Sequence, residues 1–321
     1  MQCLTPEMID RLQEDDLQSL SELDAAGIIS KPGESFPEFK NRLCSHLMSF
    51  ADFNRSIAET GEFALFEDFT LHEKDRIGDE IIQEASAVTE KLYHFSINWV
   101  PGFFLSKSVG LLWGGCAIHI PEEHLTVFLI RKNFATRKRW FIYRREELLA
   151  HELCHAARSP LKDVVFEEFF AYQTAPSRIR RYLGNCFRTQ LDALLFVLPV
   201  MLLLAVQLVD TFTSYRMPVW IFWIIALACP AFMLLRNQLA RNFFYKARKS
   251  LLAIPGAIPE PILFRCTRQE IRAIAGKHRD ASGLMDYIQE RTSSELRWKV
   301  ICNRFILKGN VTAADSGGTS T

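Results

Sequence analysis

Residues 146–158 read Glu-Glu-Leu-Leu-Ala-His-Glu-Leu-Cys-His-Ala-Ala-Arg and contain the pattern His-Glu-x-x-His at 151–155. Apolar residues recur on one face of this stretch, and no Gly or Pro interrupts it before Pro160, so it is predicted to be a helix. His151 and His155 then lie one turn apart on the same face, where both imidazoles can reach one metal ion. Their spacing predicts a zinc site, with Glu152 beside the ligands as general base for a water molecule.

A catalytic zinc site has three protein ligands and one open position, so a third ligand is expected from elsewhere in the chain. A turn at residues 159–161 would fold a second helix, beginning at Asp163, back against the first. Glu167 and Glu168 on that helix are the candidates, whereas Asp163 is better explained as its cap. Cys154 lies between the two histidines but points in another direction, and it is expected to be a small buried residue.

The run His151-Glu152-Leu153-Cys154-His155, followed by Glu168-Phe169-Phe170-Ala171, resembles the gluzincin metallopeptidases. The Glu-x-x-Ala pattern is similar to that of membrane-bound peptidases of the M48 type, and the short spacing from His to Glu is similar to that of the minigluzincins. The resemblance covers roughly residues 110–180.

This resemblance implies that Glu168 is the third zinc ligand, with Glu167 as the alternative, and that Glu152 assists the attack of water on a peptide carbonyl. M48-type sequences usually have Asp after the Ala, where it orients a metal-bound His, but this chain has Tyr172. Tyr172 either orients a ligand through its hydroxyl or packs. The group that would stabilise the oxyanion stays open among Tyr143, Tyr172 and Tyr182.

Short apolar, β-branched runs precede the histidine helix at residues 111–120, 125–130 and 140–143, and they predict three strands. Residues 5–97 have apolar positions at three- and four-residue intervals, which indicates helices. The predicted fold class is therefore α+β: a zincin-like metallopeptidase domain, with a small sheet and an active-site helix, that follows a helical N-terminal region.

Two almost wholly apolar runs, at residues 193–209 and 217–235, each have about the length needed to cross a bilayer. The short connection between them predicts a transmembrane hairpin, although two buried core helices of a soluble protein are the alternative. Basic residues crowd both flanks, while the turn contains a single Arg216, so both termini and the active site are predicted to be cytoplasmic. The flanking residues are Arg178, Arg180, Arg181 and Arg188 before the hairpin, and Arg236, Arg241, Lys246, Arg248 and Lys249 after it.

The whole chain has 321 residues and a formal charge of +1, so its total charge gives no indication of a nucleic-acid partner. Its eight cysteines are scattered and form no CxxC pair, and no signal peptide is visible, which favours a reducing compartment for the soluble parts. The predicted organisation is a helical region at 1–97, a metallopeptidase core at 98–190, the membrane hairpin at 191–236, a helical cytoplasmic domain with amphipathic segments at 237–310, and a disordered tail at 311–321.

The function predicted from these features is that of an integral membrane zinc endopeptidase. Its partners would be the lipid bilayer and a peptide or membrane-associated protein substrate, since the candidate ligands lie close in sequence to the first apolar run. An inactive, membrane-anchored scaffold with the same fold is the alternative, favoured by Tyr172 and opposed by the presence of Glu152. A transporter or channel subunit is a weaker hypothesis, because Gln207 is the only interior polar residue of the two apolar runs. Oligomeric state, natural substrate and cleavage preference are not predicted.

Overall fold

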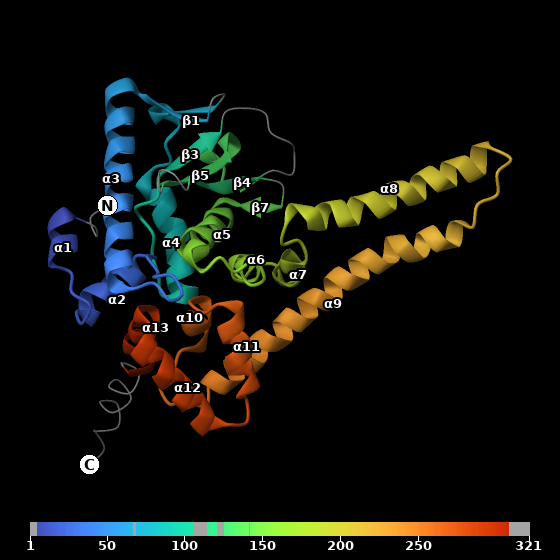
Figure 1. Ribbon diagram of the computed structural model, residues 1–321. Helices are drawn as coiled ribbons and strands as arrows, with labels where there is room; N and C mark the ends of the chain where they lie inside the picture. The colour runs from blue at the N-terminus through green and yellow to red at the C-terminus, as the bar shows by residue number, and fades with distance from the viewer. Residues whose placement is uncertain (1–4, 67–68, 106–113, 121–124, 141, 308–321) are drawn as a thin grey trace, which may run out of the picture.

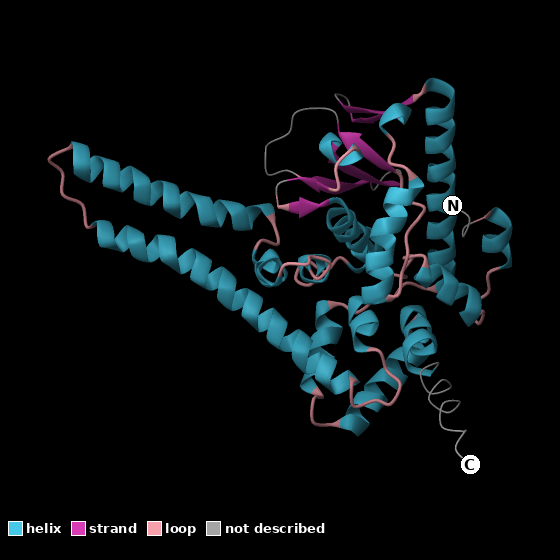
Figure 2. Cartoon of the chain, turned by 180° about the vertical axis from the view of Figure 1, so that it is seen from behind, coloured by secondary structure: helices cyan, strands magenta, loops and turns pink. Residues whose placement is uncertain are grey.

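The computed structural model describes residues 5–66, 69–105, 114–120, 125–140 and 142–307. Helices surround three small sheets, and a long helical hairpin projects from one side (Figure 1). Seen from behind, the strands gather at one end of the body, and the last helices lie at the other end (Figure 2). The molecule is therefore of the α+β class that the sequence predicts, while the tail at 311–321 lies outside the described residues.

The N-terminal region is mostly helical. The longest helix of this region is α3 (Phe36–Thr60). Ser35 precedes it and forms a capping box with Glu38, and Gly61 follows it with a left-handed φ of 74°. A β-hairpin follows α3 inside the region predicted to be helical. The helices are α1 (Pro6–Arg11), α2 (Leu17–Ala25), α3 (Phe36–Thr60) and α4 (Asp79–Tyr93), with a 3-10 turn, η1 (Glu73–Asp75), and the hairpin strands are β1 (Glu62–Phe66) and β2 (Phe69–His72).

The largest of the three sheets has three strands, in the order β3-β5-β4. The middle strand, β5 (Leu125–Arg131), is buried along nearly its whole length and pairs parallel with β3 (Gly102–Leu105). The other neighbour, β4 (Gly115–Ile120), is antiparallel to β5 and lies at the edge of the sheet. Strands at 115–120 and 125–131 confirm two of the three predicted runs, whereas β3 was not predicted, and residues 111–113 lie outside the description.

The helix predicted from the histidine motif is present as α5 (Arg145–Arg158). The run at 140–143 contributes to two short antiparallel strands, β6 (Arg139–Trp140) and β7 (Tyr143–Arg144), rather than one. The second helix begins four residues later than predicted, because Asp163 Oδ1 accepts the N–H groups of Val165 and Phe166 and closes a turn before it. The remaining short elements here are η2 (Lys132–Ala135), η3 (Ser159–Leu161), α6 (Glu167–Tyr172), α7 (Arg178–Leu183) and η4 (Gly184–Cys186).

The projecting hairpin consists of α8 (Gln190–Phe212) and α9 (Val219–Leu251), both long and apolar enough to span a membrane. Only 17% and 11% of the residues in their most apolar windows are buried, whereas a core helix of a soluble protein would be mostly covered. The boundary predicted at residue 236 falls inside α9. Since no Gly or Pro follows Pro230 before residue 251, the helix continues as a stalk into the body.

The chain ends in a group of short helices that pack onto both the stalk and the N-terminal helices. They share one apolar core with the site region, in which Phe264 stacks on Tyr93 of α4 and also contacts Phe170 of α6. The fully buried Arg265 pairs with Asp24 of α2 at 2.7 Å and donates to the Tyr93 carbonyl. The helices are α10 (Pro259–Phe264), α11 (Arg268–Gly276), α12 (Ala281–Ser294) and α13 (Leu296–Cys302), followed by the π-helical turn η5 (Asn303–Leu307).

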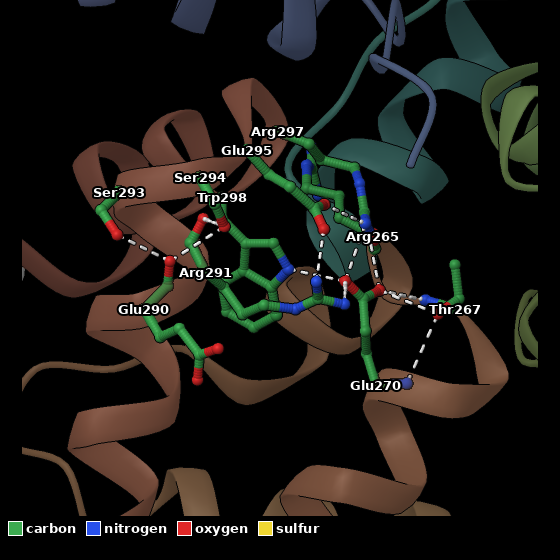
Figure 3. A network of polar contacts seen from close by, with 10 residues as sticks. All are labelled: Arg265, Thr267, Glu270, Glu290, Arg291, Ser293, Ser294, Glu295, Arg297 and Trp298. Carbon is green, nitrogen blue, oxygen red and sulfur yellow. Dashed lines mark hydrogen bonds and ion pairs between the residues drawn. The ribbon is translucent and has the colours of Figure 1, made fainter. Parts of the chain in front are cut away.

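Glu270 of α11 is the centre of a buried polar network (Figure 3). Its carboxylate accepts two hydrogen bonds from Arg297, at 2.8 and 2.9 Å, and one from Trp298 Nε1 at 2.6 Å. The same carboxylate accepts the N–H of Thr267, which caps α11. This one side chain therefore joins the start of α11 to α13.

Candidate metal centre

Helix α5 has one face in the core and another on a cavity. Leu149 and Leu153 are buried in the core, while His151 and His155 line a cavity of about 480 Å³. The edge strand β4 packs between β5 and this helix at Gly115, where a Cβ would meet Leu129 O of β5 at 2.7 Å and Leu148 of α5 at 3.3 Å. The cavity is thus bounded by β4, α5 and the first turn of α6.

Three of the side chains that line the cavity, those of His151, His155 and Glu168, converge on one point. His151 Nε2 and His155 Nε2 lie 3.1 Å apart, and the Glu168 carboxylate lies 3.6 Å from the first and 3.5 Å from the second. With one ligand atom taken from each residue, the three atoms all lie within 4.8 Å of one another. The group formed by His151, His155 and Glu168 could therefore hold a metal ion.

The spacing of these donors fits zinc. Ligands about 2.1 Å from a tetrahedral ion are about 3.4 Å from one another, and the closest approaches here are 3.1, 3.6 and 3.5 Å, the last two made by Oε2 and Oε1 of Glu168 respectively. Two imidazoles and one carboxylate leave the fourth position to the cavity, which is the ligand count of catalytic rather than structural zinc sites. Ligand type alone does not single out zinc, because imidazole also suits copper, iron and nickel.

Glu167, the neighbour of Glu168, contacts the other side of the cluster. Its Oε1 lies 3.2 Å from His155 Nδ1. Because a carboxylate only accepts hydrogen bonds, this contact assigns the proton to Nδ1 and leaves the Nε2 lone pair directed at the metal position. Burial lowers the pKa of His151 well below its ordinary value, and hydrogen bonding to the backbone of Ala171 opposes this shift. Each histidine therefore has a neighbouring group that can orient it: Glu167 for His155 and the backbone of Ala171 for His151.

We expect Glu167→Ala to weaken zinc affinity by about 10- to 100-fold, because the carboxylate that orients His155 and increases its basicity is removed. The measurement is zinc retention by the full chain during titration with a chelator. Glu146→Ala, on the first turn of α5, is the matched control and should retain zinc as the wild type does. Equal affinity in Glu167→Ala and wild type would show that the contact does not support the site.

Tyr172 packs against the cluster. Its ring lies edge-on to His151, with centroids 4.7 Å apart and an interplanar angle of 78°. Burial raises the pKa of its phenol to about 12, so the hydroxyl stays protonated and can donate at neutral pH. Of the two roles left open for Tyr172, packing is the one observed, since its ring packs on His151 while the side chain also lines the cavity.

Glu152 is buried and is not one of the three converging ligands. Its Oε2 accepts the backbone N–H of Ala117 at 2.8 Å. Ala117 lies opposite Phe128 of β5, whose N–H is directed to the other side of the sheet. In an antiparallel pair of this register, the backbone groups of Ala117 point away from β5. The contact therefore fixes Glu152 against the open edge of the sheet.

The cluster concentrates negative charge where little water reaches it. Burial raises the pKa of Glu152 above its ordinary value. Burial also raises the pKa of Glu168 to about 7, opposed by His155 and reinforced by Glu152 and Glu167. For His155, burial lowers the pKa, but Glu167, Glu168 and Glu152 raise it to about 9. A divalent cation would replace the proton on His155 and neutralise the crowded carboxylates.

A second cavity, of about 190 Å³, adjoins the first and shares His151, Glu152 and Tyr172 with it. Arg180 of α7 lines this cavity, where its guanidinium lies 2.5 Å from the buried carboxylate of Glu147 and 5.0 Å from the ring centroid of Tyr143. Arg180 was predicted only as part of the basic flank of the hairpin, and Glu147 was not predicted. The position of Glu147, one turn before His151 on the same helix, was the available signal.

The other candidates lie apart from the cluster. Cys154 is fully buried in the core, as predicted, and burial raises the pKa of its thiol. Tyr182, the third tyrosine considered for the oxyanion, donates instead to Gln238 Oε1 of α9 at 3.1 Å. No protein-family model, curated protein or solved structure significantly matches this chain. The resemblance to gluzincins therefore rests on the residues of the motif itself.

Proposed function

We propose that this protein is a membrane-anchored, zinc-dependent peptide hydrolase. One observation supports it most: a buried carboxylate, Glu152, lies beside three converging metal-ligand side chains without being one of them. A structural metal site needs no additional base, whereas hydrolysis requires a group that takes a proton from the attacking water.

His151, His155 and Glu168 would hold the ion, which, when bound, supplies Lewis-acid polarisation of the peptide carbonyl and lowers the pKa of water. Glu152 has its Oε2 held by Ala117, so Oε1 is free to accept the proton of the attacking water. The same oxygen then donates that proton to the amine of the leaving peptide. Glu167 keeps His155 in the tautomer that ligates.

The open edge of β4 supports a peptide as the substrate. An extended chain can pair with a sheet edge through backbone hydrogen bonds, and no described strand pairs with this side of β4, whose residues Gly115, Cys116 and Ala117 line the larger cavity. The N–H of Ala117 is held by Glu152, so the pairing would use the neighbouring backbone groups of the edge. Such pairing would bring a peptide carbonyl next to the metal position. The predicted cytoplasmic orientation rests on the excess of Arg and Lys at the base of the hairpin.

An inactive scaffold is the second candidate, supported by Tyr172 where M48-type sequences have Asp. The contact between Glu167 and His155 weighs against it, because the orienting role is filled by another residue. The two candidates differ in one measurable property, namely whether bound zinc is accompanied by peptide cleavage.

The test uses the full chain purified in detergent and a generic peptide mixture analysed by mass spectrometry. We expect cleavage to stop when zinc is removed by a chelator and to return on addition of zinc but not of magnesium, because the ligands are imidazoles and one carboxylate. His155→Ala is the matched control and should neither retain zinc nor cleave. Zinc bound to the wild type without cleavage would favour the scaffold.

A further inference from the structure

Four large apolar side chains are exposed where the hairpin joins the body: Ile142, Ile179, Leu183 and Phe187. We call them the collar. Ile179 and Leu183 lie one turn apart on α7, Ile142 lies in the turn between β6 and β7, and Phe187 lies between η4 and α8. Arg180 joins two of these elements, since its Nη1 donates to the Ile142 carbonyl at 3.3 Å.

The collar is continuous with the apolar surface of the hairpin. The ring of Phe187 packs edge-on against Phe196 of α8, with centroids 5.9 Å apart. On the other side, Asn237 and Arg241 of α9 donate to the carbonyls of Tyr182 and Arg181, so α7 is fixed against the stalk. The collar therefore cannot move independently of the two helices that are apolar enough to span a membrane.

These contacts define the height of α7 relative to the bilayer. The apolar run of α9 ends at Leu235, and at about 1.5 Å per residue Asn237 and Arg241 lie about 3 and 9 Å beyond it. The polar headgroup layer on each side of the hydrocarbon is roughly 5–8 Å thick. With the hairpin inserted, α7 lies at the level of the headgroups.

The composition of α7 suits that layer. The helix reads Arg-Ile-Arg-Arg-Tyr-Leu, with no acidic residue; Arg180 pairs with the buried Glu147, whereas Arg178 is exposed and Arg181 partly exposed. Apolar side chains can enter the boundary between headgroups and acyl chains while neighbouring arginines contact lipid phosphates. An apolar surface beside basic residues would be a poor solvent-facing surface but is typical of a membrane-contacting one.

We propose that the collar is seated in the headgroup layer of the same bilayer that holds the hairpin. The occupant of this surface is lipid, preferably anionic, and not a second protein. Both α7 and β7 also border the smaller cavity beside His151, through Arg180 and Tyr143. That cavity is then held beside the membrane surface. A consequence, which rests on the proposed function, is that the substrates are peptide segments at or emerging from the bilayer.

The test places the photoreactive residue p-benzoylphenylalanine at single positions of the full chain in vesicles of phosphatidylcholine and phosphatidylglycerol. Ile179 is 69% exposed, and Met48 on the distant α3 is a matched control at 67%. Leu198 in the middle of α8 is the positive control. After irradiation, mass spectrometry is expected to find lipid adducts at Ile179 and Leu198 but not at Met48.

A lipid adduct at Leu198 without one at Ile179 would overturn the proposal, as would a crosslink from Ile179 to a second copy of the chain. Leu183 provides a second collar position in case one replacement disturbs folding. The readout requires neither metal nor catalysis, so the same adducts are expected in a Glu152→Gln background. A result that contradicts the membrane seating of the collar is therefore distinguishable from one that contradicts the proposed hydrolysis.

The substrate consequence has its own measurement. In wild type, a peptide anchored to the vesicle by an acyl chain should be cleaved several-fold faster than the same peptide free in solution. Ile179→Asp should reduce that ratio, because a charge opposes seating of the collar. An unchanged ratio would contradict the substrate consequence.

Discussion

Glu152→Gln is expected to reduce peptide cleavage by roughly 10²- to 10⁴-fold, the usual contribution of general acid–base catalysis, while zinc stays bound. The amide keeps the shape of the side chain, and its oxygen can still accept the N–H of Ala117. What it lacks is a group that takes a proton from water. The measurement is the initial rate of cleavage of a peptide identified from the mixture, together with the zinc content of the same sample.

Glu146→Gln is the matched control for this change. Glu146 lies on the same helix but does not line either of the two cavities, and it pairs with Arg144 instead. Its replacement should leave the rate unchanged. Undiminished cleavage by Glu152→Gln would remove Glu152 from the mechanism, and loss of zinc in that variant would show that the carboxylate supports binding rather than proton transfer.

Glu270→Gln is expected to lower the free energy of unfolding by about 3 kcal/mol, because the buried Arg297 loses the carboxylate that accepts two of its hydrogen bonds and keeps only Glu295 as a counter-charge. The measurement is a urea titration of the full chain in detergent, followed by tryptophan fluorescence, since Trp298 donates directly to Glu270. Glu290→Gln on the exposed face of α12 is the control and should change stability by less than about 0.5 kcal/mol. Equal midpoints for the two variants would contradict the assigned role.

The stabilisation that Glu270 gives to the fold should be lost at acid pH. Burial raises its pKa, but the charge of Arg297 and the hydrogen bonds that Glu270 accepts outweigh burial and hold the pKa below its ordinary value of 4.5. The stabilisation is therefore fully present above pH 4.5 and is lost as the pH falls through the lower, folded-state pKa. The difference between wild type and Glu270→Gln should shrink in acid. A difference that stays constant down to acid pH would show that Glu270 is not the titrating group.

Much of the metal centre could be predicted from sequence because helical spacing alone places His151 and His155 on one face. The third ligand could not be chosen from the residues, since Glu167 and Glu168 are neighbours and the rotation of α6 decides which of them faces the cluster. That rotation depends on the turn closed by Asp163, which delays the helix to Glu167. In the structure Glu168 faces both Nε2 atoms and Glu167 faces Nδ1 of His155.

Other features depend on contacts between distant parts of the chain. Asp24 and Arg265 are 241 positions apart, and no local pattern indicates that they pair. The strand β3 has only four residues and gains its stability from pairing with β5 and packing on Phe53. The hairpin, by contrast, was predictable, because hydrophobic length is a property of consecutive residues.

The most direct test of the metal centre is zinc-edge X-ray absorption on the purified full chain with its zinc content determined. We predict one zinc per chain, bound by nitrogen and oxygen alone, with the scattering pattern of two imidazoles. Absence of zinc, or sulfur in the coordination shell from Cys116 of the cavity or Cys154 of the core, would contradict the assignment of His151, His155 and Glu168 as the ligands.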